Sequence, residues 1–355
     1  MISHEHMQEI QNIGRIAFHV VGDTGGIGYA VPQQIVDMHM ESDFNAGNPQ
    51  SNPAFFYHLG DVVYYYGEAD NYPEQFYRPY THYPAPIFAI PGNHDGDQNY
   101  KLPENSRPPS LEAFVNNFCQ KNPTITPEAA DVDRHAMTQP NVYWSLETPL
   151  VNIIGLYSNV PEGGEIIQDQ FDWFVNELAS TPANTALIVA VHHPAFSLDN
   201  FTSGSITIKD NLENGFKKSG RIADMVLTGH VHNYQRFTYS YDGQKIPYIV
   251  AGAGGYPNLH CMQRTSGMPN LHCMKEEAYD RLEVPVSLPN YNLTLENYCD
   301  NRHGFLRIEV TQNVIIGEYY TVPRPQESWN APSQRIDNFE LDLKEHRLTK
   351  SSISR

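Results

Sequence analysis

Five short segments of this chain, each placed after a run of apolar residues, carry side chains of the types that bind metal ions. They are Gly22-Asp23-Thr24-Gly25, Gly60-Asp61-Val62-Val63-Tyr64, Gly92-Asn93-His94-Asp95, Val189-Ala190-Val191-His192-His193 and Gly229-His230-Val231-His232. A sixth, glycine-rich segment at 251–255 ends another apolar run without supplying a ligand, and we expect it to form a pocket wall. In open α/β sheets the functional loops lie at the carboxyl ends of the strands. One sheet edge can therefore gather these side chains, which suffice for two metal ions.

Two metal ions held about 3.5–4 Å apart suit the hydrolysis of a phosphate ester, because they screen the phosphate charge and lower the pKa of a bound water. Such a pair needs a carboxylate that bridges the ions and separate ligands for each ion. Asp61 is the best candidate for the bridge, since it ends an apolar run at a glycine and has candidate ligands before and after it in the chain.

In their order along the chain, the five segments resemble the motif blocks of the purple acid phosphatases, a branch of the calcineurin-like metallophosphoesterases. The likeness spans about residues 15 to 256. The resemblance implies three ligands for each ion and one shared ligand. They are Asp23, Tyr64 and His232 for the first ion, Asn93, His192 and His230 for the second, and Asp61 as the bridge. In that family the first ion is typically Fe(III) and the second is Fe, Zn or Mn, which agrees with hard oxygen donors at one position and imidazoles at the other.

Two positions distinguish the branches of this superfamily. Most metallophosphoesterases have a histidine two residues after the first aspartate, whereas this chain has Gly25. Tyr64, three residues after Asp61, is the replacement ligand of the purple enzymes. A phenol has an unperturbed pKa of about 10, so only a strongly Lewis-acidic ion holds it as phenolate near neutral pH. Gly25 and Tyr64 together favour an iron-tyrosinate site.

Three more residues are candidates for catalytic roles. The resemblance implies that His94 faces the leaving group, where it would stabilise phosphoryl oxygens or protonate the departing alkoxide. Asp95 would orient the His94 imidazole, as carboxylates near metal sites often do. His193 follows the ligand His192 and would contact substrate, contact a ligand or merely pack, because neighbouring residues at a strand end point in different directions. His58 could support a ligand from the run before Asp61.

The resemblance also implies a fold and an activity. The fold is an α/β metallophosphoesterase four-layer sandwich, in which two mixed β-sheets pack together with helices outside and the dinuclear site lies at the strand ends. The activity is the hydrolysis of a small phosphate monoester by a metal-bound hydroxide. Two alternatives stay open: a dinuclear phosphodiesterase of the same superfamily, and a metal-binding scaffold that has lost catalysis.

Apolar periodicity predicts which elements hold the segments in place. The predicted strands lie at 15–22, 54–60, 86–90, 150–157, 185–192, 225–228 and 246–251, and a β-hairpin at 305–322. Helices are predicted at 31–43 and 168–180, where apolar residues of the second recur at helical spacing. Strands that alternate with helices are typical of an α/β layer architecture.

We expect one catalytic domain at 13–322, with no further domain before the first segment, and a polar, partly helical tail at 323–355. Within the domain, the hexapeptide Pro-Asn-Leu-His-Cys-Met occurs at 257–262 and again at 269–274. Two His-Cys pairs have ligand types that suit structural zinc, but adjacent residues chelate one ion awkwardly. We therefore favour a duplicated loop without a metal of its own.

Composition limits the remaining possibilities. The 355 residues are 40% hydrophobic and 12% aromatic, which supports a large core. A formal net charge of −18 repels polyanions, so we expect no polymeric nucleic acid as a partner. No stretch approaches the roughly 18 apolar residues of a membrane helix, and the polar start lacks a secretory pattern. Four scattered cysteines do not form a disulfide framework. We expect a cytoplasmic protein, with periplasmic or secreted as the alternative and the oligomeric state open.

Overall fold

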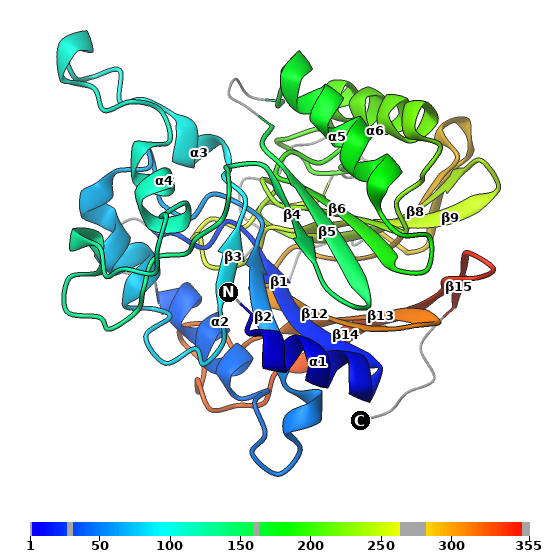
Figure 1. Cartoon of the computed structure of the whole chain (residues 1–355), viewed down its shortest axis with the longest axis horizontal. Helices are drawn as coiled ribbons and strands as arrows, with labels where there is room; N and C mark the ends of the chain where they lie inside the picture. Colours follow the sequence, from blue (N-terminus) through cyan, green and yellow to red (C-terminus); the bar gives the residue numbers. More distant parts are fainter. Residues whose placement is uncertain (1, 27–30, 159–162, 263–281, 350–355) are drawn as a thin grey trace.

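The computed structural model describes residues 2–26, 31–158, 163–262 and 282–349, and its strands form two mixed sheets that pack face to face (Figure 1). In the seven-stranded sheet the order is β15-β14-β13-β12-β1-β2-β3. Its strands are β1 (Arg15–Val21), β2 (Pro53–His58), β3 (Ile87–Ala89), β12 (Gly304–Thr311), β13 (Val314–Thr321), β14 (Gln334–Asp342) and β15 (Arg347–Thr349). The predicted α/β sandwich of two mixed sheets is confirmed.

The eight-stranded sheet has the order β10-β11-β8-β9-β7-β6-β5-β4. Its strands are β4 (Trp144–Glu147), β5 (Val151–Leu156), β6 (Ala186–Val191), β7 (Met225–Thr228), β8 (Tyr234–Tyr241), β9 (Gln244–Ala251), β10 (Val286–Leu288) and β11 (Leu293–Cys299). The strands β5, β6, β7 and β9 run parallel, as do β1, β2 and β3 in the other sheet. Each predicted strand and the hairpin is present, whereas β4, β8, β10, β11, β14 and β15 were not predicted.

Helices surround the two sheets, and the one at His4–Ile13 packs against the core between the sheets through Ile10 (Figure 1). They are α1 (His4–Ile13), α2 (Val31–Glu41), α3 (Asn93–Gly96), α4 (Glu112–Phe118), α5 (Gln168–Ser180) and α6 (Ile206–Ser219). Short turns of 3-10 or π type add η1 (Pro49–Ser51), η2 (Ala69–Asn71), η3 (Pro73–Tyr77), η4 (Glu104–Ser106), η5 (Pro127–Ala129) and η6 (Pro289–Tyr291). The two predicted helices correspond to α2 and α5.

Strands that are buried on both faces explain the continuous apolar runs in the sequence. Along β1, Phe18 and Val20 belong to the core between the sheets, whereas Val21 belongs to the core beneath α2. The same alternation places Phe55 between the sheets and Phe56 on the helix side of β2. Because successive side chains of a strand point to opposite faces, one strand contributes residues to both cores.

The segment 323–355 differs from the expected tail. Its strand β14 pairs along its length with β13, and Phe339 and Leu341 are buried while Glu340 between them is not fully covered. Two hydrogen bonds of 2.6 and 2.9 Å also join the Asp337 carboxylate to Arg236 of the other sheet. Over the described residues 323–349 the expected helix is wrong, because the segment forms the strands β14 and β15.

The duplicated hexapeptide is described only in its first copy, and 269–274 lies outside the described residues. Within that first copy, Cys261 is buried and disulfide-bonded. An oxidised cysteine supplies no thiolate, so the structure does not support the alternative of a His-Cys zinc site there.

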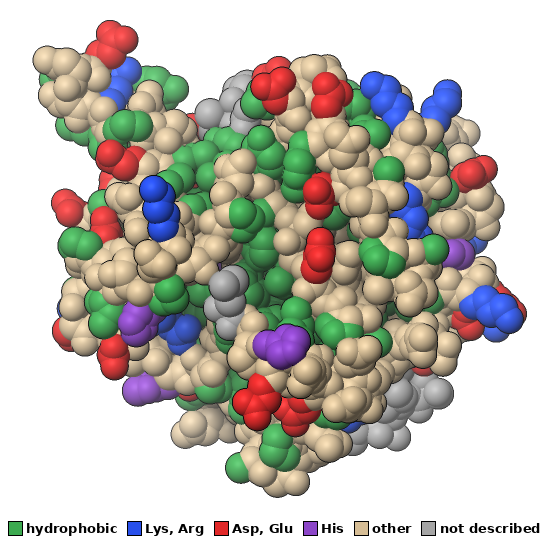
Figure 2. Space-filling model, viewed as in Figure 1, with side chains coloured by type: hydrophobic (Ala, Val, Ile, Leu, Met, Phe, Trp, Pro, Cys, Tyr) green, Lys and Arg blue, Asp and Glu red, His purple; other side chains and the backbone are tan. Residues whose placement is uncertain are grey.

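On the surface, acidic and basic side chains are interspersed over the face in Figure 2. Among the described residues, no helix is both long enough and apolar enough to cross a membrane.

Candidate metal centre

Each predicted ligand segment lies at the carboxyl end of a parallel strand. Asp23 follows β1, Asp61 follows β2 and Asn93 follows β3, while His192 and His230 follow β6 and β7. Asp23, Asp61 and His230 have φ values of 58°, 53° and 67°, in the left-handed region that side chains other than glycine rarely adopt. Such local strain persists where the surrounding structure enforces it and is concentrated at functional sites.

Three of the predicted ligands form a first cluster. The Tyr64 hydroxyl lies 3.3 Å from Asp23 Oδ1 and 3.2 Å from His232 Nε2. His232 Nε2 in turn lies 3.6 Å from Asp23 Oδ1. All three side chains are buried, and their oxygen and nitrogen atoms lie within 3.6 Å of one another.

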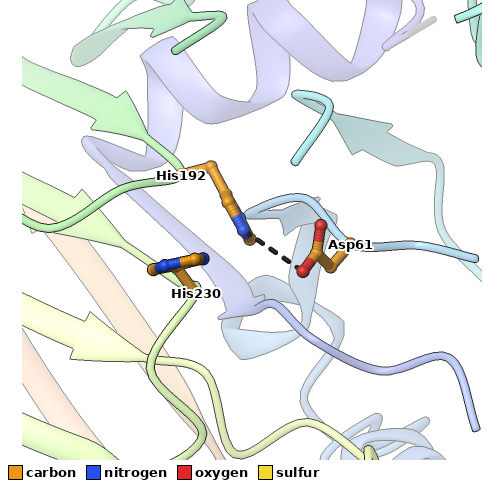
Figure 3. Close-up of side chains that lie close together, drawn as sticks. All are labelled: Asp61, His192 and His230. Atoms are coloured by element: carbon orange, nitrogen blue, oxygen red, sulfur yellow. Dashed lines mark ion pairs between the residues drawn. The ribbon is translucent and has the colours of Figure 1, made fainter. Parts of the chain in front are cut away.

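A second cluster surrounds the Asn93 amide oxygen, which lies 3.1 Å from His192 Nε2 and 2.9 Å from His230 Nδ1. Asp61 Oδ2 lies 3.3 Å from the same His192 nitrogen. Figure 3 shows Asp61, His192 and His230 with their side chains turned towards one another, and ligand atoms of the three lie within 4.8 Å of one another. Asp61 also interacts with the Tyr64 hydroxyl, which places it between the two clusters.

Backbone carbonyls determine which ring nitrogen faces each cluster. His192 Nδ1 lies 2.7 Å from the Leu59 carbonyl and His232 Nδ1 lies 3.0 Å from the Asn258 carbonyl. A carbonyl only accepts hydrogen bonds, so each Nδ1 carries a proton, and when the ring is neutral its lone pair is at Nε2. These lone pairs face carboxylate and amide oxygens that also accept. Cations at the two centres would satisfy all of these atoms, so the residues present fit a pair of metal ions.

The electrostatics of the site favour bound positive charge. Burial raises the pKa of Asp23 well above its ordinary value, and the Asp61 carboxylate adds to that rise. Burial and the same two carboxylates raise the pKa of the Tyr64 phenol well above its ordinary value. Although burial opposes charge on the ring, Asp61 raises the pKa of His192 to about 9. Metal ions would supply the positive charge that these buried oxygens require.

Two glycines allow the close approach of these groups. A Cβ atom at Gly92 would collide with Asp61 Oδ1. At Gly25 it would lie 2.6 Å from both Gln75 Oε1 and the Val62 carbonyl, and 3.1 Å from Cδ2 of Tyr64. A side chain at position 25 would therefore collide with Gln75 and the Val62 backbone and would crowd the Tyr64 ring.

His94 is half-buried at the start of α3, and its Nδ1 lies 2.9 Å from the Tyr65 carbonyl. The ring packs 4.5 Å from the Tyr64 ring, centroid to centroid. Its backbone N–H donates to Asp61 Oδ1 over 2.9 Å. His94 is therefore fixed beside the first cluster, with Nε2 as the nitrogen left to contact a ligand.

Asp95 has a different set of contacts from the one expected. Its buried carboxylate accepts hydrogen bonds from the backbone N–H groups of Gly92, Val62 and Val63, at distances from 2.8 to 3.2 Å. The Tyr65 carbonyl, not Asp95, is bonded to the His94 ring. Burial and the nearby Asp61 raise the pKa of Asp95 to about 7, against the N–H groups that stabilise its charge. Asp95 holds the two ligand loops together and does not orient His94.

His193 lies next to the second cluster, with its ring centroid 4.3 Å from that of His230. Its Nδ1 lies 2.7 Å from the Ser158 hydroxyl. Its Nε2 is buried and has no hydrogen-bond partner among the described residues. His193 therefore contacts the predicted ligand His230, and its role stays a prediction.

Several supporting residues were not predicted from the sequence. Gln75 accepts from the Tyr64 N–H over 2.8 Å and donates to the Tyr64 carbonyl over 3.1 Å. Gln33 donates to the Gln75 carbonyl over 2.6 Å. The Tyr256 ring covers Tyr64 and His232, with centroid distances of 4.4 and 4.5 Å. Tyr256 directly follows the glycine-rich segment at 251–255, and this position was the one feature of the sequence that could have indicated its place beside the site.

His58, expected to support a ligand, lies in the core behind the site. Its Nε2 is 2.8 Å from the Thr24 hydroxyl, and its Nδ1 accepts from the Gly60 N–H over 3.2 Å. Burial lowers its pKa to about 3, so the ring is neutral. His58 thus braces the residues adjacent to Asp23 and Asp61.

Comparison with known proteins identifies relatives of this chain. A family model described as calcineurin-like phosphoesterase matches residues 16–234. A stretch of 126 residues is 31% identical to probable purple acid phosphatase 20 of Arabidopsis thaliana and covers 32% of this chain and 28% of that protein. Purple acid phosphatase 21 of the same plant is 28% identical over 127 residues, which cover 34% of this chain and 28% of the relative. Either match therefore spans less than a third of the relative's length.

Solved structures share the fold. Purple acid phosphatase PPD1 from yellow lupin (Lupinus luteus) seeds aligns with a TM-score of 0.59 at 14% identity, over 96% of this chain and 57% of that one. GAP50, described as the anchor in the inner membrane complex of Plasmodium, gives 0.58 at 14% identity, over 92% and 89%. PhoD gives 0.55 at 16% identity, over 96% and 72%. At these identities the likeness concerns the fold alone.

Proposed function

This chain belongs to the calcineurin-like phosphoesterases, and from that premise we propose that it is a metal-dependent phosphomonoesterase of the purple acid phosphatase type. The observation that carries the proposal is the pair of buried ligand clusters joined by Asp61, one of which includes the Tyr64 hydroxyl. The short matches to two plant purple acid phosphatases support the same branch.

The two clusters would bind different ions. Asp23, Asp61, Tyr64 and His232 offer three oxygen donors and one imidazole, which suits Fe(III). Asp61, Asn93, His192 and His230 offer two oxygens and two imidazoles, which suits Fe, Zn or Mn as a divalent ion. When bound, the two ions would neutralise the phosphate charge and make water acidic enough to serve as a nucleophile near neutral pH.

The protein's own residues would orient the substrate and donate a proton to the leaving group. His94 is held by its Nδ1 contact to the Tyr65 carbonyl, so Nε2 is the atom available to a phosphate ester. A proton donated from Nε2 would stabilise the departing alkoxide, a contribution typically of about 10²–10⁴-fold. Gln75 and Asp95 would keep Tyr64 and the Asp61 loop in position while this happens.

The substitution Asn93→Ala tests the proposal. It removes the oxygen at the centre of the second cluster, so kcat/KM for an aryl phosphate should fall by more than the roughly 10–100-fold that loss of a supporting contact costs. Asn184→Ala is the matched control, because that exposed amide lies in the turn before β6, at the opposite end of the strand from His192. If metal-loaded Asn93→Ala hydrolysed the ester as well as the unmodified protein, the proposal would be wrong.

Two other functions make different predictions. A phosphodiesterase of the same superfamily would hydrolyse diesters better than monoesters, a comparison that uses two substrates and one preparation. A scaffold would bind both metals and turn over neither ester. GAP50, which has a similar fold, is described as an anchor. The packing of Tyr64 into the space at Gly25 favours the monoesterase branch.

A further inference from the structure

His260 lies beside the candidate metal centre although it belongs to none of the five ligand segments. Its ring centroid is 4.4 Å from that of His232, with 35° between the ring planes. Its backbone N–H donates to the His232 carbonyl over 2.9 Å. The first copy of the duplicated hexapeptide is thus attached to the outer side of a predicted ligand.

A row of packed rings connects His260 with His94. Neighbouring centroids lie 4.4 to 4.5 Å apart along the row. The row is His94, Tyr64, Tyr256, His232 and His260. An imidazole therefore lies at each end of this row of rings, which includes Tyr64 and His232 of the first cluster.

A buried carboxylate positions the His260 ring. Asp199 Oδ2 accepts from the Phe201 and Thr202 N–H groups over 2.9 and 2.8 Å, so the carboxylate itself cannot swing. His260 Nδ1 lies 3.3 Å from the same oxygen, at ion-pair distance but without a well-aligned hydrogen bond. Nδ1 is buried, whereas the side chain keeps 21% of its exposure. Nε2 is therefore the ring nitrogen that a ligand can reach.

On the basis of the phosphoesterase function proposed above, we propose that His260 contacts the substrate and selects monoesters over diesters. A monoester has three non-bridging oxygens, whereas a diester carries a second organic group on one of them. Held with Nδ1 beside Asp199, His260 presents Nε2 for a hydrogen bond with an oxygen present only in the monoester. In a diester the second substituent would occupy that place, close to the ring and to exposed Phe201, whose centroid lies 5.3 Å from that of His260.

The test compares p-nitrophenyl phosphate with bis(p-nitrophenyl) phosphate as substrates. In His260→Ala, kcat/KM for the monoester should fall about 10- to 100-fold, the range for loss of a charge-assisted hydrogen bond, while that for the diester stays within about twofold. His260→Gln retains a side chain that forms hydrogen bonds and should recover part of the loss. His135→Ala removes an exposed imidazole and should change neither substrate.

Equal losses for both esters at unchanged metal content would overturn the proposal, because a merely structural role of His260 cannot alter the ratio. An unchanged ratio would do the same. If the unmodified protein hydrolysed neither ester, the proposed function would fail instead. Inorganic phosphate binding, measured by calorimetry on the metal-loaded protein, then tests His260 by itself: His260→Ala should weaken the affinity about tenfold or more, and equal affinities would refute the contact.

Discussion

Asp95 provides a quantitative test of how the ligand loops are held. In Asp95→Ala, the backbone N–H groups of Gly92, Val62 and Val63 lose their buried acceptor. An unsatisfied buried donor costs about 1–3 kcal/mol, so the three together cost about 3–9 kcal/mol, with the lower end applying if water enters the space. This is a large fraction of the usual 5–15 kcal/mol of net stability.

The expected change in Tm follows from the size of the chain. Unfolding entropy of about 2.1 cal/mol/K per residue gives about 0.75 kcal/mol/K for 355 residues. Asp95→Ala should therefore lower Tm by about 4–12 °C. Asp95→Asn keeps one oxygen, which can still accept from the Val62 and Val63 N–H groups. The NH2 group of the asparagine would face the Gly92 N–H, so one of the three donors loses its acceptor. About one third of the decrease in Tm is therefore expected. Thermal unfolding followed by circular dichroism measures both.

Activity distinguishes loop support from a role through His94. If Asp95 only holds the loops, both variants should lose metal affinity, and kcat/KM should fall by the same factor for esters with good and with poor leaving groups. The reasoning would be refuted if Tm were unchanged in both variants. It would also be refuted if activity fell only for poor leaving groups, since that is the pattern expected when the leaving-group acid itself is disturbed.

Three further outcomes follow from the structure. Tyr64→Phe should abolish the visible charge-transfer absorption expected of an iron-loaded protein, whereas His94→Ala should keep this absorption. An unaltered spectrum in Tyr64→Phe would exclude the phenolate as a ligand. His94→Ala should slow alkyl phosphates about 10²–10⁴-fold and nitrophenyl phosphates much less, and rates that fall equally would rule out proton donation to the leaving group. Asp337→Ala leaves Arg236 buried without its bidentate partner and should cost about 3–5 kcal/mol, measured by denaturant unfolding. A loss under 1 kcal/mol would show that the ion pair between Asp337 and Arg236 contributes little to stability.

Prediction from sequence worked best where the signal was local. The runs before Asp23, Asp61 and His192 are apolar on both strand faces, which distinguishes strands from the loops that follow them. Ligand-type side chains directly after such runs must emerge at the strand ends. The strand β14 was not predicted, because its polar residues alternate with its buried ones. A short alternation within a charged stretch is a weak indication of a strand, and the pairing of β14 with β13 is visible only in the structure.

By itself, the sequence determined the types of the candidate ligands, their order and the strand ends that carry them, because these depend on residues next to one another. Only the tertiary structure decided what each side chain contacts. The His230 N–H and the Asp23 carboxylate, which meet at 2.9 Å, are 207 residues apart in the chain, and Asp95 meets Val62 across 33 residues. Such contacts depend on strand register and on the packing of two sheets, and local propensity predicts neither. The same packing brought His260 and Asp199 together beside His232.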